Sequence, residues 1–167
     1  MSWLRHKNTE DRCHRATTLL VSDMSAGLSR QQIVTWLGVL GIVPFLLALA
    51  WPDPDISFRA FSLYSLAIFC FLCGNWWSVS LLSSAITAPQ RVLVLLLSNV
   101  LLLVALVLVF LEMPASLIGM AVLYAGLVAG ESQLAVFARQ PAYYCRMRRG
   151  VSAAVVLLHI AGWYLVT

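Results

Sequence analysis

The sequence predicts an all-α protein, built as an integral membrane bundle of five transmembrane helices. Of its 167 residues, 61% are apolar and only 11% are charged, whereas an average soluble domain has roughly 25% charged residues. Five charge-poor stretches also approach the length of about 20 residues that a helix needs to cross a bilayer. A soluble chain of this size would expose large apolar patches. The composition therefore excludes a soluble globular domain, a disordered chain and a nucleic-acid-binding protein.

The first predicted span, residues 33–51, lies in a stretch that has no charge between Arg30 and Asp53. Pro44 lies inside this span and lacks the amide hydrogen of a regular helix, so we expect a kink there. The second predicted span covers residues 61–83, in the next uncharged stretch. A short polar turn follows it.

The third predicted span, residues 92–111, consists almost entirely of Leu and Val and follows Pro89. Proline is typical of the first turn of a helix. Pro114 separates this span from the fourth, residues 115–137. A basic loop then leads to the fifth, residues 150–166.

Residues 1–30 are expected to form a cytoplasmic tail, and residues 31–167 the five-helix transmembrane domain. The tail is either flexible or an interfacial helix that places Trp3 and Leu19 on anionic lipid. Met24 offers a second site at which translation could start.

Basic residues predict the orientation, because Lys and Arg are enriched in the cytoplasmic loops of membrane proteins. Ten of the eleven lie on the side of the N-terminal tail if every predicted span crosses the membrane. We therefore expect a cytoplasmic N-terminus and an external C-terminus. The ten are Arg5, Lys7, Arg12, Arg15, Arg30, Arg91, Arg139, Arg146, Arg148 and Arg149, and the exception is Arg59.

Four polar residues are predicted to lie at membrane depth, and Glu131 is the only carboxylate among them. Counting about 1.5 Å per residue from the cytoplasmic helix ends puts all four in one layer about 9–14 Å deep. Such groups either satisfy one another and hold the helices in register, form a ligand, ion or proton site, or contact a partner subunit. Alternatively, Glu131 lies close enough to the membrane surface to reach water. The predicted polar layer consists of Asn75, Asn99, Glu131 and His159.

Small residues in the fourth span predict close helix packing. Gly126 and Gly130 are four positions apart, a spacing that lets two membrane helices approach closely. The partner helix would belong either to the same chain or to a second copy of it.

No set of residues typical of an enzyme, a metal site or a cofactor site is found, so we predict no catalytic residues, no metal and no cofactor. Cys70 and Cys73 have the spacing of redox and metal sites. They lie in the middle of an apolar helix, however, where a partner thiol could not reach them. Cys13 and Cys145 are expected on the cytoplasmic side, where a stable disulfide is not expected.

Three short motifs occur in order along the chain: Gly41-Ile-Val-Pro44-Phe45, Phe71-Leu-Cys-Gly74-Asn-Trp-Trp77-Ser78 and Tyr144-Cys-Arg-Met-Arg148. Together they resemble a family of small, uncharacterised bacterial inner-membrane proteins that includes the mitochondrial transmembrane protein 69. The sequence departs from the family pattern at Cys73, Ser78 and Tyr143. The motif residues are Gly41, Pro44, Phe45, Gly74, Trp77, Tyr144 and Arg148.

The resemblance implies a topology and leaves the activity open, because this family has no established activity. In it Pro44 would set a kink, and Gly74 would allow a close approach beside Trp77. Arg148 would anchor the cytoplasmic loop to lipid headgroups or to a helix end.

The function we predict is a non-enzymatic accessory, assembly or scaffold subunit of a larger membrane complex. Its expected partners are membrane lipids and either another membrane protein or a second copy of the chain. The alternative is a small transporter or channel that uses the polar layer around Glu131, as a dimer. A third hypothesis is membrane thiol redox chemistry through Cys70 and Cys73.

Overall fold

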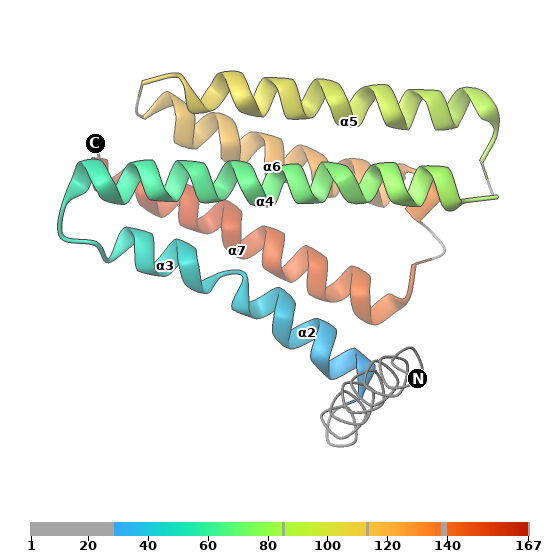
Figure 1. Ribbon diagram of the computed structural model, residues 1–167, viewed down its shortest axis with the longest axis horizontal. Coiled ribbons are helices and arrows are strands. Elements are labelled where there is room, and N and C mark those ends of the chain that lie inside the picture. Colours follow the sequence, from blue (N-terminus) through green and yellow to red (C-terminus); the bar gives the residue numbers. More distant parts are fainter. Residues whose placement is uncertain (1–28, 85, 113, 138–139, 167) are drawn as a thin grey trace, which may run out of the picture. The chain divides into compact units, whose positions relative to one another are not determined.

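A computed structural model describes residues 29–84, 86–112, 114–137 and 140–166, and these residues form helices joined by short turns (Figure 1). The chain divides into two compact units, Met1–Leu37 and Gly38–Thr167, and the site described below lies in the second. The predictions for residues 1–28, which include the interfacial helix and Cys13, lie outside the described residues.

The first predicted span is broken into two helices, α2 (Arg30–Leu40) and α3 (Val43–Leu49). Pro44 occupies the first turn of α3, where a missing amide hydrogen leaves no helix bond unmade. The Tyr64 hydroxyl donates a hydrogen bond of 2.9 Å to the Gly41 carbonyl at the break. The predicted kink is thus a full interruption of the helix.

Helix α4 (Pro54–Leu82) begins seven residues before the predicted second span. The Asp53 side chain caps it by accepting hydrogen bonds from the backbone amides of Asp55, at 2.9 Å, and of Ile56, at 3.2 Å. Pro54 occupies the first position. The two acidic residues Asp53 and Asp55 therefore form the start of the helix.

The third and fourth predicted spans correspond to α5 (Ala88–Val109) and α6 (Ala115–Gln133). Helix α6 ends four residues earlier than predicted, because the chain turns into a short 3₁₀ helix, η1 (Ala135–Phe137). This turn places Phe137 against Trp76, with the ring centroids 5.3 Å apart.

The last helix, α7 (Ala142–Val166), begins eight residues before the predicted fifth span. The stretch expected to be a basic loop, which contains Arg146, Arg148 and Arg149, is therefore the first part of the helix. Arg148 pairs with a buried carboxylate. This partner explains how a charged residue can lie within the helix and inside the bundle.

Within the second unit, each helix from α3 to α7 packs against the next one along the chain, and α4 also contacts α6. Figure 1 shows that the chain reverses direction at each of these connections. Buried apolar side chains from all five helices fill the space between them, and the largest are Phe45, Phe61, Phe69, Trp76, Leu117, Met120, Tyr124 and Leu127.

Four segments of the described chain are long and apolar enough to cross a membrane. Helix α7 is not among them, since its apolar part begins only after Arg149. The chain therefore has the architecture of a multi-pass helical membrane protein. The four segments are Gln31–Leu49, Pro54–Leu82, Ala88–Val109 and Ala115–Gln133.

Candidate functional site

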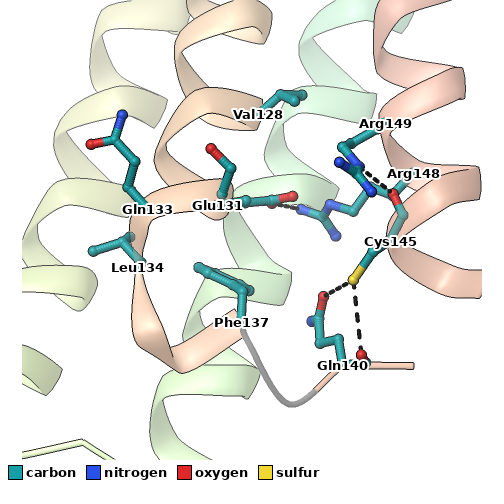
Figure 2. Close-up of a pocket in the computed structure, with 10 residues that line it drawn as sticks. Val128, Glu131, Gln133, Leu134, Phe137, Gln140, Cys145, Arg148 and Arg149 are labelled. Atoms are coloured by element: carbon teal, nitrogen blue, oxygen red, sulfur yellow. Dashed lines mark hydrogen bonds and ion pairs between the residues drawn. The ribbon is translucent and has the colours of Figure 1, made fainter. Parts of the chain in front are cut away.

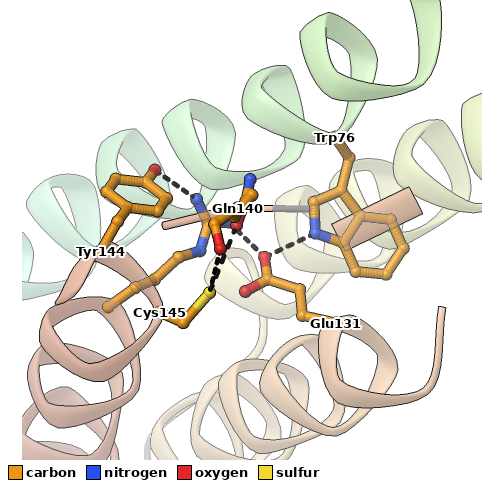
Figure 3. Close-up of polar contacts among 6 residues, drawn as sticks. Trp76, Glu131, Gln140, Tyr144 and Cys145 are labelled. Atoms are coloured by element: carbon orange, nitrogen blue, oxygen red, sulfur yellow. Dashed lines mark hydrogen bonds and ion pairs between the residues drawn. The ribbon is translucent and has the colours of Figure 1, made fainter. Parts of the chain in front are cut away.

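Glu131, in the last turn of α6, forms an ion pair with Arg148 in the second turn of α7. Both side chains are largely buried, with exposed fractions of 11% for Glu131 and 6% for Arg148. Figure 3 shows that Trp76 of α4 points toward the same carboxylate, and its Nε1 donates a hydrogen bond of 2.7 Å to Glu131 Oε1. One carboxylate oxygen thus connects three helices.

Tyr144 completes this group, because Arg148 Nη1 donates a hydrogen bond of 3.1 Å to its hydroxyl. A Cβ atom at Gly130 would lie 3.0 Å from the Trp76 ring, so glycine at this position lets the indole lie close to α6. We call Trp76, Glu131, Tyr144 and Arg148 the Glu131 cluster.

A pocket of about 360 Å³ opens beside the Glu131 cluster, between the end of α6, η1 and the start of α7 (Figure 2). Its lining includes two guanidinium groups, one carboxylate, two amide side chains and a thiol. The lining residues are Val128, Glu131, Ser132, Gln133, Leu134, Phe137, Gln140, Cys145, Arg148 and Arg149.

His159 of α7 makes a second polar contact with α4. Its Nδ1 lies 2.8 Å from the Val155 carbonyl, which can only accept, so in the neutral ring Nδ1 carries the proton. Nε2 is then the acceptor, and it receives a hydrogen bond of 2.8 Å from the Ser65 hydroxyl. This pairing leaves no polar atom of the imidazole unmatched.

Aromatic rings from α3, α4 and α6 surround the contact between His159 and Ser65. The rings of Phe61, Tyr124 and Phe45 lie 4.8, 5.5 and 6.0 Å from the His159 ring, measured between centroids. The Tyr124 hydroxyl also donates a hydrogen bond of 2.8 Å to the Ser65 carbonyl. All five side chains are at most 1% exposed. We call Phe45, Phe61, Ser65, Tyr124 and His159 the His159 cluster.

The two clusters occupy different levels of the bundle, although the sequence placed Glu131 and His159 in one layer. Their partners on α4, Ser65 and Trp76, are eleven positions apart, which is about 16 Å along a helix. The depth of His159 was counted from residue 150, but α7 begins at Ala142. The early start of α7 accounts for the separation.

The two asparagines of the predicted layer belong to neither cluster. Asn99 is exposed on α5, and its side chain donates a hydrogen bond of 2.8 Å to the Leu95 carbonyl of the same helix. Asn75 is half-buried, and its Nδ2 is buried without a hydrogen-bond partner. The structure therefore brings Glu131 to Trp76 and Arg148, and not to Asn75 or His159.

The family motif residues divide into buried and exposed positions. Gly41 and Pro44 form the helix break, and Phe45 is fully buried beside it. Trp77 is 42% exposed, and a Cβ atom at Gly74 would meet nothing within 4 Å. No described residue of the chain therefore makes the close approach implied for Gly74.

The third motif contributes two residues of the Glu131 cluster, Tyr144 and Arg148. Arg148 pairs with Glu131 and Tyr144 in the bundle. The partner that the structure gives Arg148 on α6 is thus the Glu131 side chain, and its implied role as an anchor for the loop stays a prediction.

The two glycines predicted to pack helices closely, Gly126 and Gly130, have different surroundings. Gly130 packs against Trp76, as expected for packing within the chain, whereas a Cβ atom at Gly126 would meet nothing within 4 Å. Gly126 and its neighbours Ala125 and Ala129 are exposed on α6. We call these three residues the small-residue face.

The described cysteines, Cys70, Cys73 and Cys145, are free thiols, and Cys73 is buried. Within the described part of the chain, no three His, Cys, Asp or Glu side chains gather where they could hold a metal ion.

Sequence reasoning missed the partners on α4 and α6, namely Ser65, Trp76 and Tyr124. A signal for two of them was present, because the buried residues of α4 recur at helical spacing and include Ser57, Phe61, Ser65, Phe69, Leu72 and Trp76. Polar and aromatic residues that share one stripe of a membrane helix indicate a face that contacts other helices.

No curated protein and no solved structure matches the chain. A family of proteins of unknown function, DUF3429, matches residues 30–164. This match covers α2 to α7 with all three motifs and both clusters, so the chain belongs to the DUF3429 family.

Proposed function

We propose that this protein is a non-enzymatic membrane protein that acts as an accessory, assembly or scaffold subunit beside another membrane protein. The observation that carries the proposal is the small-residue face of α6, which no other part of the described chain covers at Gly126. Membrane helices associate through such surfaces, because small side chains let the two backbones approach closely. A covering helix would come from a partner.

The internal use of the polar groups supports the same proposal. The Glu131 carboxylate is occupied by Arg148 and Trp76, and the His159 ring by Ser65 and Val155. Side chains that satisfy one another hold helices in register. They are not then available as a chain of ion or proton sites.

The proposal includes a topology of five spans in a bacterial inner membrane, with α7 as the fifth and the N-terminus in the cytoplasm. Ten basic residues on one side and one on the other support it. A reporter enzyme that is active only outside the cytoplasm, fused after Thr167, should be active. The same reporter fused after Gln140 should be inactive, and the opposite pattern would overturn the orientation.

Co-purification in mild detergent tests the accessory role. The full chain should elute with a stoichiometric partner, either another membrane protein or a second copy, and Gly126→Ile should reduce the recovered partner at least tenfold. Gly150→Ile is the matched control, because a Cβ atom at Gly150 also meets nothing within 4 Å. Elution of the wild-type chain as a solitary monomer would refute the proposal, as would equal recovery with both variants.

The alternative is a small transporter or channel, and the pocket beside Glu131 is the observation that favours it. Flux into proteoliposomes should then disappear in the double variant Glu131→Gln, Arg148→Met, which removes both charges together. Unchanged flux in this variant would exclude a transport role for the Glu131 cluster.

A further inference from the structure

The pocket beside the Glu131 cluster has a net positive lining. Arg148 and Arg149 contribute two positive charges and Glu131 one negative charge. Both Trp76 Nε1 and Arg148 Nη2 bind the same oxygen, Oε1, of Glu131. The negative charge of Glu131 is thus neutralised by Arg148, and the positive charge of Arg149 is left over in the pocket lining.

Arg148 has a hydrogen-bond donor that the ion pair does not use. Its guanidinium group is largely buried in the pocket lining, and its Nε is buried without an acceptor in the described protein. An unmatched buried donor of a charged group is destabilising. A ligand oxygen that enters the pocket, with a small shift of the arginine, would remove this cost.

Arg149 supplies a second guanidinium group on the next residue of α7. It is exposed, and its Nε donates a hydrogen bond of 3.3 Å to the Cys145 carbonyl, which holds the side chain along the helix. Gln133 and Gln140 add neutral amide donors to the same lining. Two guanidinium groups with neutral donors match an oxyanion that has several acceptor oxygens.

We propose that this pocket binds a phosphate group, carried either by a phospholipid headgroup or by a soluble phosphate ester. Its volume of about 360 Å³ falls within the range of ligand pockets, about 300–1,000 Å³. The proposed topology places the junction of α6 and α7 at the cytoplasmic headgroup region, and the lipid source alone rests on that topology.

Isothermal titration calorimetry of the full-length protein in an uncharged detergent tests the proposal. The probes are dihexanoyl phosphatidylglycerol, inorganic phosphate and uncharged dihexanoylglycerol. We expect saturable binding of at least one phosphate-bearing probe, and Arg149→Gln should weaken it at least tenfold. Arg146→Gln is the matched control, because it removes the same charge from an exposed residue of α7 that does not line the pocket. We expect less than a twofold effect.

The two sources give different results. Binding of the phospholipid without inorganic phosphate assigns a headgroup, whereas comparable binding of both assigns a soluble phosphate ester. Absence of binding by both, equal binding of dihexanoylglycerol, or equal effects of the two arginine variants would overturn the proposal. None of these outcomes depends on the co-purification test with the Gly126 variant. The proposal of phosphate binding and the proposal of an accessory role can therefore be refuted independently.

Discussion

The Glu131 cluster and the His159 cluster connect the same three helices, α4, α6 and α7, by different chemistry. The His159 cluster uses a neutral ring and hydroxyl groups, and its side chains are at most 1% exposed. The Glu131 cluster uses a charged pair that lines a pocket. The closed contact is neutral, and the one beside a pocket is charged.

This difference follows from the cost of removing charge from water. An ion pair buried on all sides loses more solvation energy than its attraction returns unless every remaining donor is matched. In the His159 cluster each polar atom has one partner, so a neutral network suffices. In the Glu131 cluster the Nε of Arg148 has no hydrogen-bond partner in the described protein. The same arginine lines the adjacent pocket, where the acceptor proposed above would be a ligand.

The largest expected effect is that of Glu131→Gln. It leaves the Arg148 charge buried without a counter-ion, so we expect the free energy of unfolding in detergent to fall by about 3–5 kcal/mol. Unfolding by increasing mole fractions of sodium dodecyl sulfate measures this. The double variant Glu131→Gln, Arg148→Met should recover most of the loss. If it is as unstable as the single variant, the ion pair does not account for the effect.

Replacing His159 with Ala should have the next largest effect. It removes a ring that contacts Phe45, Phe61 and Tyr124 and leaves the Ser65 hydroxyl without its acceptor. We expect the free energy of unfolding to fall by about 2–4 kcal/mol, measured in the same detergent titration. His159→Phe keeps a ring and should cost less. A larger loss for His159→Phe than for His159→Ala would contradict this account of the cluster.

Tyr124→Phe isolates one hydrogen bond of the closed cluster. It keeps the ring beside His159 and removes only the donor to the Ser65 carbonyl. Hydrogen bonds between membrane helices contribute about 0.6 kcal/mol on average and up to about 2 kcal/mol, so we expect a loss in that range. A stability equal to that of the wild type would show that this bond contributes nothing.

Asn99→Leu should have the smallest effect, although Asn99 was predicted in the same layer as Glu131 and His159. Its side chain is exposed and bonds only to its own helix, so we expect a change within about 0.5 kcal/mol. A loss above about 1 kcal/mol in the same titration would place Asn99 in a contact that involves another chain.

The helices could be predicted because their apolar stretches and terminal residues are local properties of the sequence. Pro44 predicted an interruption of the first span, and Pro89 predicted the beginning of the helix that became α5. The starts of α4 and α7 were placed too late, for one reason. Asp55 and Arg148 are charged and were counted as loop residues, yet Asp55 stands beside the Asp53 cap and Arg148 beside Glu131.

The site could be predicted only in part. Glu131 and His159 were found because a titratable group in an apolar helix needs an explanation. Their partners could not be assigned, because depth along a helix was known only to within the error of its start, and the facing direction was not known at all. The choice of Trp76 over the adjacent Trp77 depends on a rotation of about 100° about the axis of α4.

The sequence separation of the cluster contacts determines when they can form during synthesis. From α3 onward each helix packs on the one before it, so most contacts become available soon after a helix emerges. The bond between Ser65 and His159 spans 94 residues, and that between Trp76 and Glu131 spans 55. Because α4 is synthesised first, Ser65 can bond to His159 only after α7 has been made, and Trp76 can bond to Glu131 only after α6 has been made.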